Sequence, residues 1–139
     1  MKISILVLFF TVFSVLFFAG CSDKTQISGQ VTYSDGTPVY PGKVCFTTGK
    51  NTFYGRLNKD GQYSVGEFKD GDGIPSGKYD VWVAETGYAV EIIKNGKPTG
   101  LYDSVERVSA KYTYPNPECP KYEIKRGRAK TFDFVVEKP

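Results

Sequence analysis

After the first 25 residues, the sequence consists of short segments in which apolar and polar side chains alternate, separated by turns rich in glycine and proline. In residues 26–33, Ile27, Val31 and Tyr33 share one face, and glutamine, serine and threonine occupy the other. A period of two residues with one polar face is typical of a half-buried strand. No segment shows a sustained helical period, so the chain is predicted to be all-β.

Further strands are predicted at intervals along the chain. They cover residues 44–48, 52–57, 63–65, 78–85, 122–125 and 131–137. Asp60-Gly61, between two of these segments, is typical of a tight hairpin turn. About seven short strands with frequent turns predict a seven-stranded antiparallel β-sandwich.

Residues 86–121 are predicted to form a long loop, because they contain four of the eight prolines and little regular pattern. Within it, residues 90–94 followed by Asn95-Gly96 can form one arm of a small hairpin. A loop of this length in a compact domain is either functional or packed by its own side chains. Its tyrosines favour packing, and Trp82, on the outer face of the preceding strand, is the side chain it is expected to cover.

The N-terminal residues are typical of an export signal, with Lys2 followed by an apolar run over residues 3–19. The run ends in Phe-Ala-Gly-Cys, which resembles the lipobox of bacterial lipoproteins. The resemblance implies cleavage after Gly20, transfer of a diacylglyceryl group to the Cys21 thiol, and acylation of the new terminus with a fatty acid such as palmitate. Two or three acyl chains anchor a protein stably. An ordinary cleaved signal and an uncleaved transmembrane segment remain as alternatives.

The predicted organisation is therefore a signal peptide (1–20), a lipidated tether (21–25) and a β-sandwich domain (26–139). Ser22 beside the cysteine resembles lipoproteins that are exported to the outer membrane, where an organism has two membranes. The expected location is the cell envelope. Without Lys2 the chain has 17 basic and 15 acidic residues, so its charge does not indicate a nucleic-acid partner.

The remaining cysteines, Cys45 and Cys119, form an even pair in an oxidising compartment, and a disulfide between them is predicted. Two unbridged thiols are the alternative. The sequence contains no histidine, which removes Ser-His-Asp and Cys-His catalysis and histidine-ligated zinc. We expect no enzyme activity, and no catalytic residue, metal ligand or cofactor site is assigned.

Several motifs resemble the carboxypeptidase regulatory-like domain. They are residues 27–33 with 36–39 and 42–46, the Asn-Lys-Asp-Gly-Gln-Tyr turn at 58–63, and Ile-Pro-Ser-Gly-Lys-Tyr-Asp-Val at 74–81. Residues 111–134 are similar to small bacterial lipoproteins that carry this module. The resemblance implies a transthyretin-like (prealbumin-like) sandwich of seven strands without catalytic activity. It carries over no binding residues.

Three features are candidate binding sites. Trp82 with nearby tyrosines could stack on a sugar, or the long loop could bury it. The basic segment 121–130, with Arg126 and Arg128 at its tip, could meet acidic glycans or lipid headgroups, or be an ordinary solvated turn. Asp70-Gly71-Asp72-Gly73 suggests calcium, but it lacks the further ligands of a calcium loop and a turn is favoured.

The sequence thus predicts a non-catalytic, lipid-anchored envelope protein that supports or binds an unknown envelope protein. A carbohydrate-binding module at the cell surface is the alternative. A hydrolase would need two carboxylates brought together, and nothing in the sequence brings together Glu85, Glu91 and Asp103.

Overall fold

The structure is a computed structural model that describes residues 23–113 and 117–139. The predicted signal peptide and Cys21 lie outside these residues. The described part is all-β apart from one 3-10 turn, η1 (Ala110–Tyr112). None of its helices is long and apolar enough to cross a membrane. The strands are β1 (Lys24–Thr25), β2 (Ile27–Tyr33), β3 (Lys43–Thr48), β4 (Asn51–Arg56), β5 (Gln62–Val65), β6 (Ile74–Pro75), β7 (Gly77–Ala84), β8 (Tyr88–Lys94), β9 (Lys97–Val105), β10 (Lys121–Ile124), β11 (Lys130–Thr131) and β12 (Phe134–Val136).

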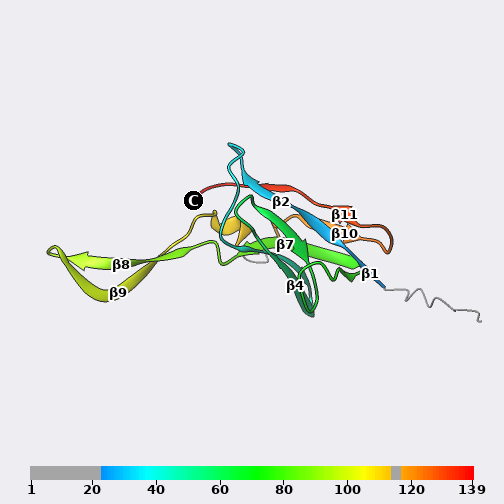
Figure 1. Cartoon of the computed structure of the whole chain (residues 1–139), viewed down its shortest axis with the longest axis horizontal. Coiled ribbons are helices and arrows are strands. Elements are labelled where there is room, and N and C mark those ends of the chain that lie inside the picture. Colours follow the sequence, from blue (N-terminus) through cyan, green and yellow to red (C-terminus); the bar gives the residue numbers. More distant parts are fainter. Residues whose placement is uncertain (1–22, 114–116) are drawn as a thin grey trace, which may run out of the picture.

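Two larger sheets form the body of the molecule (Figure 1). One is antiparallel, in the order β10-β7-β3-β4. The other is built around β2, which pairs antiparallel with β5 and parallel with β11 and β12. Two-stranded pairs, β1–β6 and β8–β9, complete the fold. The all-β architecture is confirmed, with twelve short strands among the described residues instead of the seven expected. The expectation of purely antiparallel sheets is corrected, because β11 and β12 pair parallel with β2.

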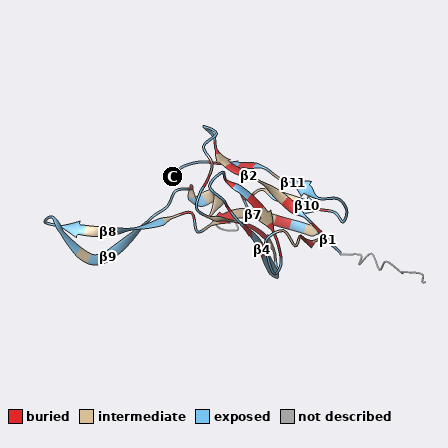
Figure 2. Cartoon of the chain, viewed as in Figure 1, coloured by how far each residue is buried: buried red, intermediate tan, exposed pale blue. Residues whose placement is uncertain are grey.

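The inward faces of the two sheets share one hydrophobic core (Figure 2). Val44 and Phe46 of β3 and Val81 of β7 are completely buried, as the alternation of those segments predicts. Phe46 lies at the centre, with four aromatic rings at centroid distances of 6.1–6.5 Å: Tyr63, Tyr79, Tyr122 and Phe132. This packing of two sheets around one apolar layer is sandwich-like.

The turn at residues 58–63 is fixed by its own polar groups. The Asn58 Oδ1 accepts backbone hydrogen bonds from Asp60 and Gln62, at 2.9 and 3.0 Å. Gly61 has φ +72°, and a Cβ there would lie 2.4 Å from the Val31 carbonyl oxygen. The motif that resembles the carboxypeptidase regulatory-like turn is thus explained locally by turn geometry.

Residues 86–121 are not a single long loop, and this prediction is corrected. They contain the antiparallel hairpin β8–β9, which extends away from the body, with Asn95 and Gly96 at positive φ in the connecting turn (Figure 1). Two of the tyrosines expected to cover Trp82, Tyr88 and Tyr102, lie on this hairpin and are 45% and 65% exposed, and Tyr114 lies outside the described residues. Only the later part returns to the body, where Val108 is buried and Tyr112 packs against the core.

Candidate functional site

The β8–β9 hairpin exposes more large apolar side chains than any other element pair among the described residues. Ile93, Leu101 and Tyr102 are 56–65% exposed, and Tyr88, Val90 and Val105 are 37–45% exposed. A two-stranded ribbon has too little buried area to be more than marginally stable by itself. Exposed apolar groups gathered on one element form a surface that can bind another molecule.

The register of the hairpin places these side chains on both of its faces. Tyr88 is opposite Val105, whereas Tyr102 is opposite Glu91, on the other face. The ladder shifts between Glu91 and Ile93, where the Glu91 carboxylate accepts a hydrogen bond from the Gly100 N–H at 3.0 Å. The hairpin therefore exposes apolar side chains on both of its faces.

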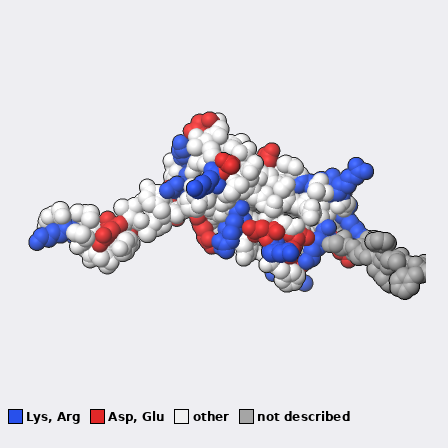
Figure 3. Space-filling view, viewed as in Figure 1, with Lys and Arg blue, Asp and Glu red and all other residues white. Residues whose placement is uncertain are grey.

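The base of the hairpin is held to the body by Arg107. Its guanidinium lies 4.7 Å from the centre of the Tyr88 ring, and its Nη1 donates to the Tyr40 carbonyl at 3.1 Å. The tip carries two exposed basic residues, Lys94 and Lys97 (Figure 3, left). The apolar surface thus lies between a fixed base and a basic tip.

The basic segment 121–130 consists of strand β10, the loop that follows it and Lys130 at the start of β11, and residues 125–130 are all exposed. The Arg126 guanidinium forms an ion pair with Asp23 at 3.2 Å. The Thr25 hydroxyl donates to the Lys125 carbonyl at 3.2 Å. The structure therefore places this loop, with Arg126 and Arg128, beside the first described residues of the chain, a proximity that sequence spacing cannot reveal.

Trp82 is half-buried on the outer face of β7, as the alternation predicts. Its indole N–H donates to the Thr47 hydroxyl at 2.8 Å. Because the indole is hydrogen-bonded to β3 and partly covered, it offers a smaller stacking surface to a sugar than an open ring would.

Cys45 and Cys119 are both buried, but they are not joined in a disulfide, so the predicted bridge is absent from the structure. The sheet order explains this, because β7 separates β3, which carries Cys45, from β10, into which Cys119 leads. Two strand spacings amount to about 9.5 Å, whereas bridged Cα atoms lie within about 7 Å. Burial raises the pKa of the Cys45 thiol to about 12.

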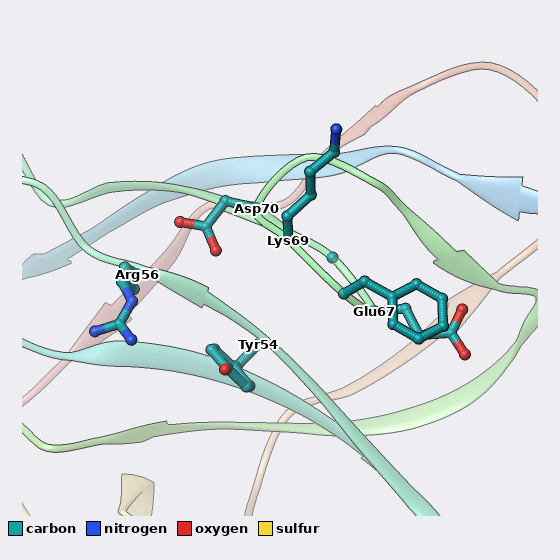
Figure 4. Close-up of a pocket in the computed structure, with 7 residues that line it drawn as sticks. Tyr54, Arg56, Glu67, Lys69 and Asp70 are labelled. Carbon is teal, nitrogen blue, oxygen red and sulfur yellow. The ribbon is translucent and has the colours of Figure 1, made fainter.

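A shallow hollow of about 280 Å³ lies between β4 and the β5–β6 loop (Figure 4). Tyr54 and Arg56 of β4 lie across from Asp70 of the loop, whereas the Lys69 side chain extends away from them (Figure 4). Phe68, 84% exposed, also lines the hollow. Each aromatic ring has a lysine ammonium over it, from Lys43 on Tyr54 and from Lys24 on Phe68. Sequence reasoning missed this hollow, because its two walls are brought together only by tertiary contact.

The carboxylates suggested by the sequence serve other contacts. Asp72 accepts the backbone N–H groups of Phe68 and Lys69, at 3.3 and 3.2 Å, and so closes the turn. Glu85 pairs with Lys43. The described residues contain no group of three His, Cys, Asp or Glu side chains arranged for a metal ion.

Glu91 and Asp103, both candidates for a carboxylate pair, do lie in the same hairpin. They fall on opposite faces, since Glu91 is opposite Tyr102 and Asp103 is opposite Val90. The hairpin therefore does not bring these two carboxylates together.

Comparisons with known proteins give little further information. No family model and no curated protein matches this chain. The crystal structure of a DUF3823 family protein from Bacteroides ovatus is similar, at 14% identity and a TM-score of 0.45. The matched region covers 83% of this chain and 45% of the Bacteroides chain, so this chain spans less than half of that protein.

Proposed function

We propose that this protein is a non-catalytic, lipid-anchored module of the cell envelope that binds a partner protein through the β8–β9 hairpin. The observation that carries the proposal is the hairpin's exposed apolar surface, centred on Ile93, Leu101 and Tyr102. The lipobox resemblance at Cys21 supports the anchor and the envelope location, in the outer membrane where there are two membranes. The resemblance to the transthyretin-like, carboxypeptidase regulatory-like sandwich supports the non-catalytic role.

The partner is a protein because the hairpin combines apolar side chains with open strand edges. Outside their mutual ladder, β8 and β9 pair with no other strand in the described part of the chain. Open edges can add to a partner's sheet, with backbone hydrogen bonds giving affinity and alternate side chains giving specificity. A hairpin with apolar groups on both faces fits such a groove or sheet edge.

Photo-crosslinking in the intact envelope tests this proposal. A benzophenone amino acid replaces Tyr102 in one strain and the still more exposed Phe68, on the body, in another. We expect a crosslinked protein from position 102, and its loss when Leu101→Asp is added. No adduct at position 102, or an adduct at position 68 alone, would overturn the assignment of the hairpin.

The hollow at Tyr54 and Phe68 favours a saccharide as the second candidate ligand. Aromatic rings beside Arg56 and Asp70 supply both a stacking surface and hydrogen-bonding groups. The lysines over the two rings restrict stacking to the opposite faces. A glycan array probed with the protein and with Phe68→Ala separates the two functions: binding that depends on Phe68 favours the saccharide.

A further inference from the structure

The hairpin tip and the basic β10–β11 loop lie at opposite ends of the molecule's long axis (Figure 1). β1, where the described chain begins, lies at the same end as the basic loop, and basic side chains gather at that end of the surface (Figure 3). The ion pair between Arg126 and Asp23 and the hydrogen bond from Thr25 to the Lys125 carbonyl both join the loop to the start of the described chain. The loop is therefore next to the point from which any N-terminal anchor leaves the domain.

From this arrangement we infer that the loop 125–130 is a membrane-contacting surface for anionic lipid headgroups. The inference rests on the proposed lipid anchor at Cys21. Asp23 follows Cys21 by two residues, and two residues of chain span at most about 7 Å. An anchored chain thus keeps Asp23, and with it the basic loop, close to the bilayer surface.

The charges at this end favour an anionic surface. Beside β1, Asp23 and Glu67 are each paired with a basic side chain, Arg126 and Lys24. Glu123 of β10, two residues before Lys125, is exposed and is outnumbered there by the basic residues of the loop. Lys125, Arg128 and Lys130 are exposed and have no ion-pair partner within the described residues. Each basic side chain close to an anionic leaflet increases association about fivefold.

This contact sets the orientation of the domain relative to the membrane. With the basic loop on the bilayer, the long axis points away from the membrane and the β8–β9 hairpin stands at the distal end (Figure 1). The apolar surface of the hairpin is then presented to proteins of the envelope space instead of lying on the lipid. A single tether would leave the domain free to tumble, whereas a second, electrostatic contact restricts it.

Hydrogen exchange of the full acylated protein tests the contact. The protein is reconstituted in vesicles of phosphatidylcholine alone or of an equal mixture with phosphatidylglycerol. We expect amide exchange in residues 125–130 to slow at least about threefold in the anionic vesicles, and to recover in high salt. Residues 94–97, at the hairpin tip, are the internal control and should exchange alike in both.

A charge-reversal pair provides the matched control. Arg128→Glu with Lys130→Glu should abolish the lipid-dependent slowing, whereas Lys94→Glu with Lys97→Glu makes the same charge change at the distal end and should retain it. All four side chains are exposed, so neither pair should impair folding. Loss of the slowing in both pairs, or in neither, would contradict the inference.

The two proposals fail in different ways. An intact mass without acyl chains on Cys21, together with failure to float with vesicles, overturns both the anchor and the membrane contact. Acylated protein that floats with either vesicle, and exchanges equally in both, overturns the membrane contact alone.

Discussion

The strands of the body and those of the β8–β9 hairpin both alternate apolar and polar side chains, but the apolar side chains are buried in the body and exposed in the hairpin. In the body, Phe46 and Val81 are completely buried between two sheets. In the hairpin, Leu101 and Tyr102 are 61% and 65% exposed, on a ribbon that no second layer from the described part of the chain covers. Alternation therefore determines that a segment is a strand, whereas burial of its apolar face requires a second layer. A strand pair without that layer is available to a partner.

Thiol chemistry gives the largest contrast between the two regions. Burial raises the pKa of Cys45 to about 12, so near pH 8 its thiolate fraction is on the order of 10³-fold below that of an ordinary cysteine. We expect native Cys45 to resist iodoacetamide while a cysteine introduced by Ser104→Cys in the hairpin reacts readily. Mass spectrometry of the time course measures this.

The same experiment tests the bridge between Cys45 and Cys119. After denaturation without reductant, both native cysteines should become alkylated. Failure of both to react under those conditions would show that they are oxidised to a disulfide, against the structure.

Truncation of core and hairpin side chains gives the next largest effect. Phe46→Ala should lower the free energy of unfolding by about 3–5 kcal/mol, because it leaves a cavity among four aromatic rings. Leu101→Ala should change it by less than about 0.5 kcal/mol, because the side chain is mostly exposed. Urea unfolding followed by circular dichroism measures both. A large loss from Leu101→Ala would mean that the hairpin packs on the body, and the contrast would disappear.

Two glycines with nearly the same positive φ isolate the packing contribution to stability. Gly61 and Gly96 have φ of +72° and +74°, but a Cβ at Gly61 meets the Val31 carbonyl oxygen at 2.4 Å, while at Gly96 nothing lies within 4 Å. Alanine costs about 1–2 kcal/mol at either position through its φ alone. Gly61→Ala should lower the free energy of unfolding by roughly a further 1–3 kcal/mol, because the added Cβ clashes with the Val31 carbonyl oxygen. Equal losses in urea unfolding would contradict the close approach.

The smallest effect concerns a turn carboxylate in the body. Hydrogen bonds from Thr37, and then Lys138, lower the pKa of Asp35 to about 2. Because the folded pKa lies below the unfolded one, the stabilisation is complete above about pH 4 and is lost as the pH falls towards 2. Asp35→Asn should therefore be slightly less stable than the natural chain at neutral pH and equal to it at pH about 2. An NMR titration measures the pKa of Asp35, and urea unfolding at neutral pH and at low pH measures the stability difference between Asp35→Asn and the natural chain.

Much of the body was predictable from local pattern. Expected strands at 26–33 and 78–85 correspond to β2 and β7 within a residue, and the outward direction of Trp82 follows from the same alternation. The hairpin was underestimated because Pro98 and Gly100 interrupt its second arm, and the ladder shift after Glu91 breaks the period of two. The even cysteine count and the expected compartment predict a bridge between Cys45 and Cys119, but neither contains information about β7, the strand that separates them.

By itself, the sequence determined the main strands of the body, the turn at residues 58–63 and which side chains of those strands face inward, since each depends on neighbours a few residues away. The tertiary structure decided which strands share a sheet, that β8 and β9 pair only with each other, and that the basic loop lies beside Asp23. These features depend on residues as far apart as 23 and 126, whose proximity arises only when the two sheets close on a common core.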